Sequence, residues 1–160
     1  MKNITGNKFR LIMESFKINI NPNAPVKCSK SIVINAKPEK VWSILTDINN
    51  WSNWQKDISK SKLNDSLQVN STFEWKTGGA KIHSTLHTVE PFTRLGWTGR
   101  TMGMYAIHNW TLTDNDGKTR VEVEESMEGF LASVLKFMFN KNLEKSIGKW
   151  LELLKKECEK

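Results

Sequence analysis

The C-terminal segment, from about residue 130 to residue 160, predicts one long amphipathic helix, or two helices in line. Its apolar residues recur at steps of three and four, the spacing of a single helical face, while lysines and glutamates fill the other face. The stripe consists of Leu131, Val134, Leu135, Met138, Leu143, Ile147, Trp150, Leu151, Leu154 and Cys158. A stripe this long must be buried against a broad apolar surface, so Trp150 is expected on the buried side of the helix.

Seven strand-like segments, rich in Thr, Val, Ile and Trp, can supply that surface. They cover roughly residues 27–36, 57–64, 69–77, 80–90, 94–101, 104–113 and 118–127. The gaps between the last six contain Gly, Asn, Asp or Pro, which favour turns and an antiparallel meander with one apolar face. We therefore predict an α+β fold, in which a curved antiparallel sheet of about seven strands wraps around the long C-terminal helix and leaves a hollow between them.

Two short helices are expected between the first strand and the second. Pro38 suits the first turn of a helix over residues 37–48, where Val41, Trp42, Leu45 and Ile48 recur at helical spacing. Residues 49–57 break this helix and are expected to form a second short one. Trp51 and Trp54 can gate a cavity mouth, but we expect them to close the seam between the short helices and the sheet.

Alternation along each strand separates an apolar inner face from a polar outer face. The inner-facing residues are Phe73, Trp75, Thr77, Ile82, Ser84, Leu86, Leu95, Trp97, Gly99, Ala106, His108, Trp110, Leu112, Val121, Val123, Glu125 and Met127. Ser84, His108 and Glu125 are the few polar groups in this set that can hydrogen-bond strongly inside the hollow.

His108 and Glu125 lie on consecutive strands joined by the turn at residues 114–117. A tight turn places Ala106 opposite Glu125 and His108 one diagonal away, whereas a slightly longer loop places His108 directly opposite. Cross-strand partners lie ~5 Å apart at Cβ and diagonal ones ~7 to 8 Å apart, so both registers permit contact. A histidine held by a carboxylate can transfer a proton near neutral pH. The same pair can instead contact a ligand or simply order the sheet, and these alternatives stay open.

Four segments together resemble the START-like, helix-grip (SRPBCC) superfamily, the polyketide cyclase/dehydrase and lipid-transport group. They are INAKPEKVWSILTDINNWSNW (34–54), FEWKTGGAKIHSTLHTVEPFTRLGWTG (73–99), AIHNWTL (106–112) and TRVEVEESMEG (119–129). The resemblance implies a hydrophobic molecule bound in a cavity between sheet and helix, and in some members aromatisation or cyclisation there. It implies no cofactor.

Our leading hypothesis is therefore a protein that binds a small hydrophobic ligand, ring-bearing or lipid-like, in an internal cavity. The expected ligand-binding residues are Trp75, Ser84, Trp97, His108, Trp110, Glu125, Met127 and Met138. One alternative is a cyclase/dehydrase-like enzyme in which His108 is the catalytic acid or base and Glu125 its partner. Another is a protein-interaction module whose cavity is filled by side chains. Only the first two require a hollow of roughly 300 Å³ or more.

The first residues follow a different pattern from the rest. The NPNAP stretch at residues 21–25 is a turn or linker signal. We expect residues 1–25 to form an N-terminal extension and residues 26–160 to form the START-like ligand-binding domain. Met13 offers a second start, so removal of residues 1–12 is expected to leave the fold intact.

Composition and spacing argue against several other classes of protein. The net charge is +7, but the lysines are scattered among acids, so no nucleic-acid partner is expected. No apolar run approaches ~18 residues, so no stable membrane insertion is expected, and no export signal is recognised. We therefore expect a cytoplasmic protein in which Cys28 and Cys158 are free thiols. The sequence favours no oligomeric state.

No metal site is expected. His83 and His87 lie on the outer face of one strand, and four strand residues span ~13 Å, too far for one zinc ion with bonds of ~2.1 Å. The two cysteines form no metal-binding spacing. Both histidines are expected to have surface roles.

Overall fold

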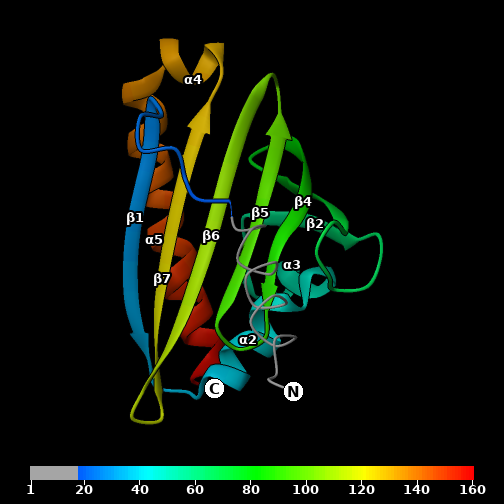
Figure 1. Cartoon of the computed structure of the whole chain (residues 1–160), viewed down its shortest axis with the longest axis vertical. Coiled ribbons are helices and arrows are strands. Elements are labelled where there is room, and N and C mark those ends of the chain that lie inside the picture. The colour runs from blue at the N-terminus through cyan, green and yellow to red at the C-terminus, as the bar shows by residue number, and fades with distance from the viewer. Residues whose placement is uncertain (1–17) are drawn as a thin grey trace, which may run out of the picture.

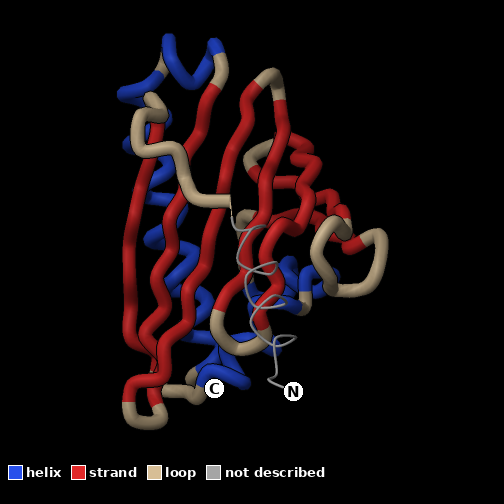
Figure 2. The backbone as a smooth tube through the Cα atoms, in the orientation of Figure 1, coloured by secondary structure: helices blue, strands red, loops and turns tan. Residues whose placement is uncertain are grey.

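A computed structural model describes residues 18–160 of the chain (Figures 1 and 2). The strands are β1 (Val26–Ile34), β2 (Ile58–Leu63), β3 (Thr72–Thr77), β4 (Ala80–Glu90), β5 (Arg94–Thr101), β6 (Met104–Asn115) and β7 (Lys118–Glu128). The helices are α2 (Pro38–Thr46), the 3-10 helix η1 (Ile48–Asn50), α3 (Trp51–Trp54), α4 (Phe130–Val134) and α5 (Lys136–Cys158).

The strands form a single antiparallel sheet in the order β1-β7-β6-β5-β4-β3-β2. Figure 1 shows α5 lying behind β1 and β7, with α2 and α3 near its C-terminal end. One face of the sheet is thus covered by helices, as its alternating apolar pattern requires. The predicted α+β helix-grip fold, with two short helices after the first strand, is confirmed.

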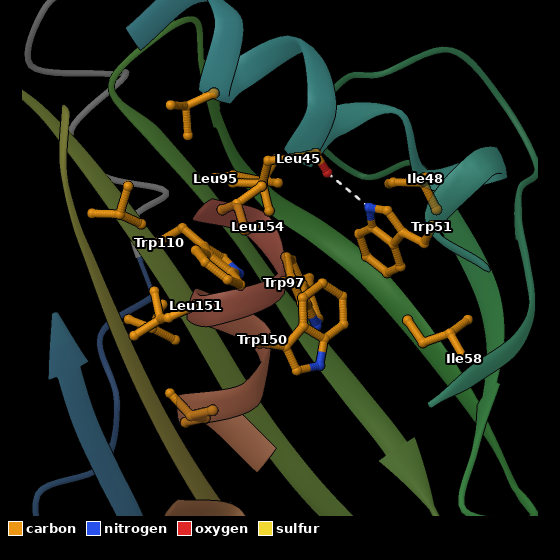
Figure 3. Close-up of a cluster of buried hydrophobic side chains, with 14 of the residues drawn as sticks. Leu45, Ile48, Trp51, Ile58, Leu95, Trp97, Trp110, Trp150, Leu151 and Leu154 are labelled. Atoms are coloured by element: carbon orange, nitrogen blue, oxygen red, sulfur yellow. Dashed lines mark hydrogen bonds between the residues drawn. The ribbon is translucent and has the colours of Figure 1, made fainter. Parts of the chain in front are cut away.

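Tryptophan side chains fill the space between the sheet and α5 (Figure 3). Trp51 is fully buried, with its ring centroid 5.7 Å from Trp97 and 5.2 Å from Trp150. Its indole N–H donates a hydrogen bond of 2.9 Å to the Leu45 carbonyl, which ties α3 to α2. Trp54 is also buried and contacts Trp150 at 5.5 Å. Trp51 and Trp54 therefore close the seam, and Trp150 lies on the buried face of α5, both as predicted.

The turn between β6 and β7 settles the register that the sequence left open. Asn115 pairs with Lys118, so Asp116 and Gly117 are the two turn residues, and both have positive φ, 53° and 81°. These angles suit a two-residue hairpin turn whose twist matches the strands. As a result His108 stands directly opposite Glu125.

The chain between β7 and α5 departs from the predicted apolar stripe. A short helix, α4, precedes α5, and Val134, Leu135 and Met138 are exposed, whereas burial is continuous along the stripe only from Leu143 onward. The prediction that these three residues are buried was wrong. Eight of the ten residues 130–139 are apolar, so three- and four-residue spacing fits more than one helical face.

Two side chains of α5, and Glu159 directly after it, hydrogen-bond to backbone groups at the free edge of β1 and just beyond its end. The Asn140 side-chain oxygen accepts from the Lys27 amide at 3.1 Å, and Lys155 donates to the Val33 carbonyl at 2.7 Å. The Glu159 carboxylate accepts from the Asn35 amide at 2.7 Å, just beyond the strand. At the opposite edge, Asn49 accepts from the β2 amide of Leu63 at 2.8 Å.

The segment that leads into β1 crosses the outer face of the sheet (Figure 1). Asn109 of β6 donates to the Ile18 carbonyl, and the Asn21 amide donates to Ser126 of β7. Residues 18–25 are therefore held against the sheet at two strands. The expectations for residues 1–12 and for Met13 fall outside the described residues.

His87 is buried, contrary to the surface role expected for it. A β-bulge between Leu86 and Thr88 makes His87 the extra residue of β4, and its side chain lies over Gly96. A Cβ atom on Gly96 would lie 2.5 Å from the His87 ring, so only glycine leaves this space. His83 is exposed as expected and pairs with Glu74 at 3.0 Å.

Burial lowers the pKa of His87 to about 4, because the charged ring would lose its hydration. An unfolded histidine titrates near pH ~6.5, so between these values the unfolded chain binds more protons. The contribution of neutral His87 to stability is complete above ~6.5 and is lost as the pH falls toward 4. We expect the free energy of unfolding to fall by about 2 kcal/mol from this residue between about pH 7 and pH 4.5.

Denaturant melts over this pH range test the expectation. His87→Gln removes the titration and should flatten the pH dependence, while His83→Gln, at an exposed position, should leave it unchanged. Identical slopes for the wild type and His87→Gln would contradict a neutral buried His87.

Candidate functional site

One row of residues crosses the inner face of the sheet and contains the polar pair. The register places Cys28 opposite Glu125, Glu125 opposite His108, and His108 opposite Trp97. Leu86 continues the row on β4. The sheet therefore brings a thiol, a carboxylate and an imidazole together from β1, β7 and β6.

His108 is fixed on two sides. Its Nδ1 lies 2.5 Å from the Glu125 Oε2 atom, and its ring is stacked on the Trp97 indole, with 4.4 Å between centroids and 7° between planes. Both side chains of the pair are largely buried, with exposed fractions of 9% for His108 and 14% for Glu125. A carboxylate can only accept, so Nδ1 carries the proton that is donated to Glu125. In the neutral ring Nε2 is then left as a hydrogen-bond acceptor.

The Nε2 atom of His108 is buried and has no hydrogen-bond partner in the described part of the chain. A buried polar atom without a partner costs ~1 to 3 kcal/mol. The same imidazole ring lines a small apolar cavity.

The cavity has a volume of about 60 Å³ and lies between β3, β4, β5, β6 and β7. It is lined by Trp75, Ile82, Trp97, Gly99, Thr101, Met104, Ala106, His108, Glu125 and Met127. Pockets that hold drug-sized ligands have volumes of roughly 300 Å³ or more. The observed space takes only a few ligand atoms, because the tryptophans occupy most of the hollow.

Five of the eight residues predicted to bind ligand line this cavity, namely Trp75, Trp97, His108, Glu125 and Met127. Ser84 is buried beside it and accepts a hydrogen bond of 3.1 Å from the Trp75 indole. Trp110 packs 6.5 Å from Trp97 without lining the cavity.

Met138 is half exposed on α5 and does not line this cavity. It lies five residues before Leu143 on the same helix, a rotation of about 140°, so it faces away from the apolar stripe. The prediction also missed Ile82, Gly99, Thr101, Met104 and Ala106 as lining residues. The alternation that assigned inner faces also covers Thr101 and Met104, the terminal residues of β5 and β6, so the signal was present in the sequence.

The site residues predicted from the sequence do not include Cys28. It adjoins Glu125, but burial raises the pKa of its thiol, which keeps it protonated and weakens it as a nucleophile. Burial also raises the pKa of Cys158, to about 12. Both cysteines are free thiols, as predicted.

Two larger hollows on the surface have polar walls. One, of about 410 Å³, is lined by Lys60, Lys62, Asn64, Glu74, Trp75, Lys76 and Lys81. The other, of about 240 Å³, shares Asn64 and Glu74 and extends to Arg100. Lysine and glutamate walls do not suit an apolar ligand. Within residues 18–160 no cluster of three or more His, Cys, Asp or Glu side chains is arranged to hold a metal ion.

Comparison with known proteins identifies the family. The family model described as "Polyketide cyclase / dehydrase and lipid transport" matches residues 25–159. The chain belongs to this polyketide cyclase family. Its fold and family fit a hydrophobic ligand-binding role or a cyclase/dehydrase-like role. Among curated proteins no match is found.

Solved structures share the fold of this polyketide cyclase family member at low sequence identity. A hypothetical protein of Helicobacter pylori is 18% identical, with a TM-score of 0.78 over 89% of this chain and 97% of that one. A START superfamily protein of Mycobacterium smegmatis is 14% identical, with a TM-score of 0.73 over 83% and 97%. The Zhui aromatase/cyclase of Streptomyces sp. R1128 is 12% identical, with a TM-score of 0.74 over 83% and 93%. In the described residues no helix combines the length and apolar character needed to cross a bilayer.

Proposed function

We propose that this chain binds a small hydrophobic molecule in the cavity beside His108, with the polar end of the molecule at the Nε2 atom. The observation that carries the proposal is that this nitrogen is buried and unpaired while the same ring is held by Glu125 and Trp97. A hydroxyl or acid group on a ligand would supply the missing hydrogen bond. Apolar walls on the other sides suit a hydrocarbon or aromatic body.

A ligand larger than a few atoms requires the cavity to widen. Met104 and Met127 line it, and unbranched methionine side chains change shape at low cost. Trp75 is only partly buried, so its indole can also shift without losing a fully packed position. The cavity therefore has adaptable walls on the side of β3 and at the β5–β6 end of the sheet.

Acid–base catalysis is the second candidate, and one observation favours it. Glu125 accepts from Nδ1 and so leaves Nε2 free to take a proton from a bound substrate. A general base must reach the proton it removes, and Nε2 is a buried atom of a cavity-lining ring. In such a reaction Glu125 orients the ring and stabilises the imidazolium that forms.

Binding can be tested with 2-naphthol, which combines an aromatic body with one hydroxyl group. We expect calorimetry to detect binding to the wild type. The His108→Phe/Glu125→Leu double variant should lose affinity by a factor of about 5 to 150, equivalent to ~1 to 3 kcal/mol for the lost hydrogen bond. Native mass spectrometry of the purified wild type should in addition reveal any co-purified small molecule.

The outer face supplies a matched control. His83 and Glu74 also form a cross-strand histidine–glutamate pair, but an exposed one, so His83→Phe/Glu74→Leu should bind 2-naphthol like the wild type. Equal affinity of the two double variants would contradict the proposed anchor. Absence of both 2-naphthol binding and a co-purified molecule would favour a filled cavity and a protein-interaction role.

A further inference from the structure

One end of the molecule exposes an unusual amount of apolar surface. Phe130 and Phe137 have exposed fractions of 80% and 83%, and six of the ten exposed large apolar side chains in residues 18–160 lie at this end. The six are Met102, Phe130, Val134, Leu135, Phe137 and Met138. We call them the apolar end. Contiguous apolar patches on a soluble protein mark surfaces that contact something else.

The apolar end is built from two parts of the chain. Phe130, Val134, Leu135, Phe137 and Met138 belong to α4 and the start of α5, with the connection between them. Met102 lies in the β5–β6 turn. Gly129 brings the two parts together, since a Cβ atom there would lie 2.6 Å from the Gly103 carbonyl oxygen. Figure 1 shows α4 at the same end of the molecule as the β5–β6 turn.

The segment that supplies most of the apolar end is positively charged. Between Gly129 and Leu143 the chain has two lysines, Lys136 and Lys141, and no acidic residue. Lys136 places its ammonium group 5.3 Å from the centre of the Phe137 ring. The acidic residue just before this segment, Glu128, is hydrogen-bonded by Asn21.

We propose that the apolar end docks on the surface of an anionic lipid bilayer. The exposed rings of Phe130 on α4 and Phe137 on α5 can enter the boundary between head groups and acyl chains, while the two lysines meet the lipid phosphates. The helices themselves stay at the surface. This docking goes beyond the proposed ligand binding and does not depend on it.

Charge favours a bilayer over a second copy of the chain. Two apolar ends placed face to face would bring Lys136 and Lys141 of both copies together with no acidic residue of this segment to neutralise them. Lipid phosphates supply the opposite charge instead. The position is also useful, because Thr101, Met104 and Met127, which line the cavity, lie toward this end of their strands.

Vesicle flotation of the full chain tests the proposal. We expect binding to vesicles of phosphatidylcholine with phosphatidylglycerol, weakened about fivefold or more on phosphatidylcholine alone. Phe130→Ser/Phe137→Ser should weaken binding to the anionic vesicles at least about tenfold, because it removes both inserted rings. The two side chains are so exposed that thermal melts of this variant should match the wild type.

Two further variants separate the contributions. Val33→Ser/Val69→Ser changes exposed apolar residues away from this end and should bind like the wild type. Lys136→Gln/Lys141→Gln should remove the preference for anionic vesicles. The proposal is overturned if the wild type fails to float with anionic vesicles or if the phenylalanine variant floats equally well. It is also overturned if sedimentation shows a dimer that the phenylalanine variant dissociates without any vesicle binding, because the end is then an interface between copies.

Discussion

Trp51→Ala is expected to lower the free energy of unfolding by about 3 to 5 kcal/mol, the range for removing a large aromatic side chain from a core. The Trp51 indole is fully buried and contacts Phe73, Trp75, Trp97 and Trp150. Its removal leaves a cavity in the middle of the cluster and strips the Leu45 carbonyl of its donor. Denaturant unfolding, followed by circular dichroism, measures the loss.

A graded control distinguishes packing from the hydrogen bond. Trp51→Phe keeps an aromatic ring but loses the indole N–H, so it should cost less than the alanine variant. Phe92, which is exposed, provides a second comparison, and Phe92→Ala should have a far smaller effect even though its ring meets Trp42 edge-on. A loss below ~1 kcal/mol for Trp51→Ala would mean that the cluster is not the stabilising centre of the fold.

His108→Phe is expected to lower the free energy of unfolding by about 3 kcal/mol. The phenyl ring can keep the contact with Trp97, but Glu125 is left largely buried without its partner. The cost therefore comes from the stranded carboxylate and not from lost packing. Adding Glu125→Leu should restore most of the stability, because the second change removes that charge.

The double-mutant cycle gives the coupling energy between the two side chains directly. The exposed His83–Glu74 pair is again the control, and His83→Phe should change stability by less than ~1 kcal/mol. If His108→Phe left the free energy of unfolding unchanged, Glu125 would have to reach solvent when His108 is removed. The binding measurement on the double variant stays informative in either case, because the double variant is expected to fold.

The fold was predictable because its signals are local. Alternating apolar residues mark β5, β6 and β7, and the apolar spacing from Leu143 to Cys158 marks the buried face of α5. The same alternation placed His108 and Glu125 on a common inner face. Their direct pairing was not predictable, because it depends on which two residues form the β6–β7 turn.

Other features depend on three-dimensional packing that alternation does not encode. The sequence contains seven tryptophans but does not reveal whether they line a hollow or fill it, and the structure leaves only about 60 Å³. His87 lies over Gly96 on the outer face, as expected, and its burial there results from packing that alternation does not encode. Met138 is exposed because it lies on the side of α5 opposite the buried stripe that begins at Leu143, in a segment where apolar residues occur on more than one side.

The hydrogen bonds from α5 to β1 also bear on how this protein behaves when concentrated. An open sheet presents unpaired backbone groups at its edges, and such an edge can recruit a strand from another molecule and start aggregation. Asn140, Lys155 and Glu159 occupy backbone groups along one edge, and Asn49 occupies one at the other. Strand β2 also carries two charged side chains, Lys60 and Lys62. A strand that paired with β2 would have to accommodate these charges next to its own side chains. The helix that covers the core thus also hinders the addition of a strand at the β1 edge of the sheet.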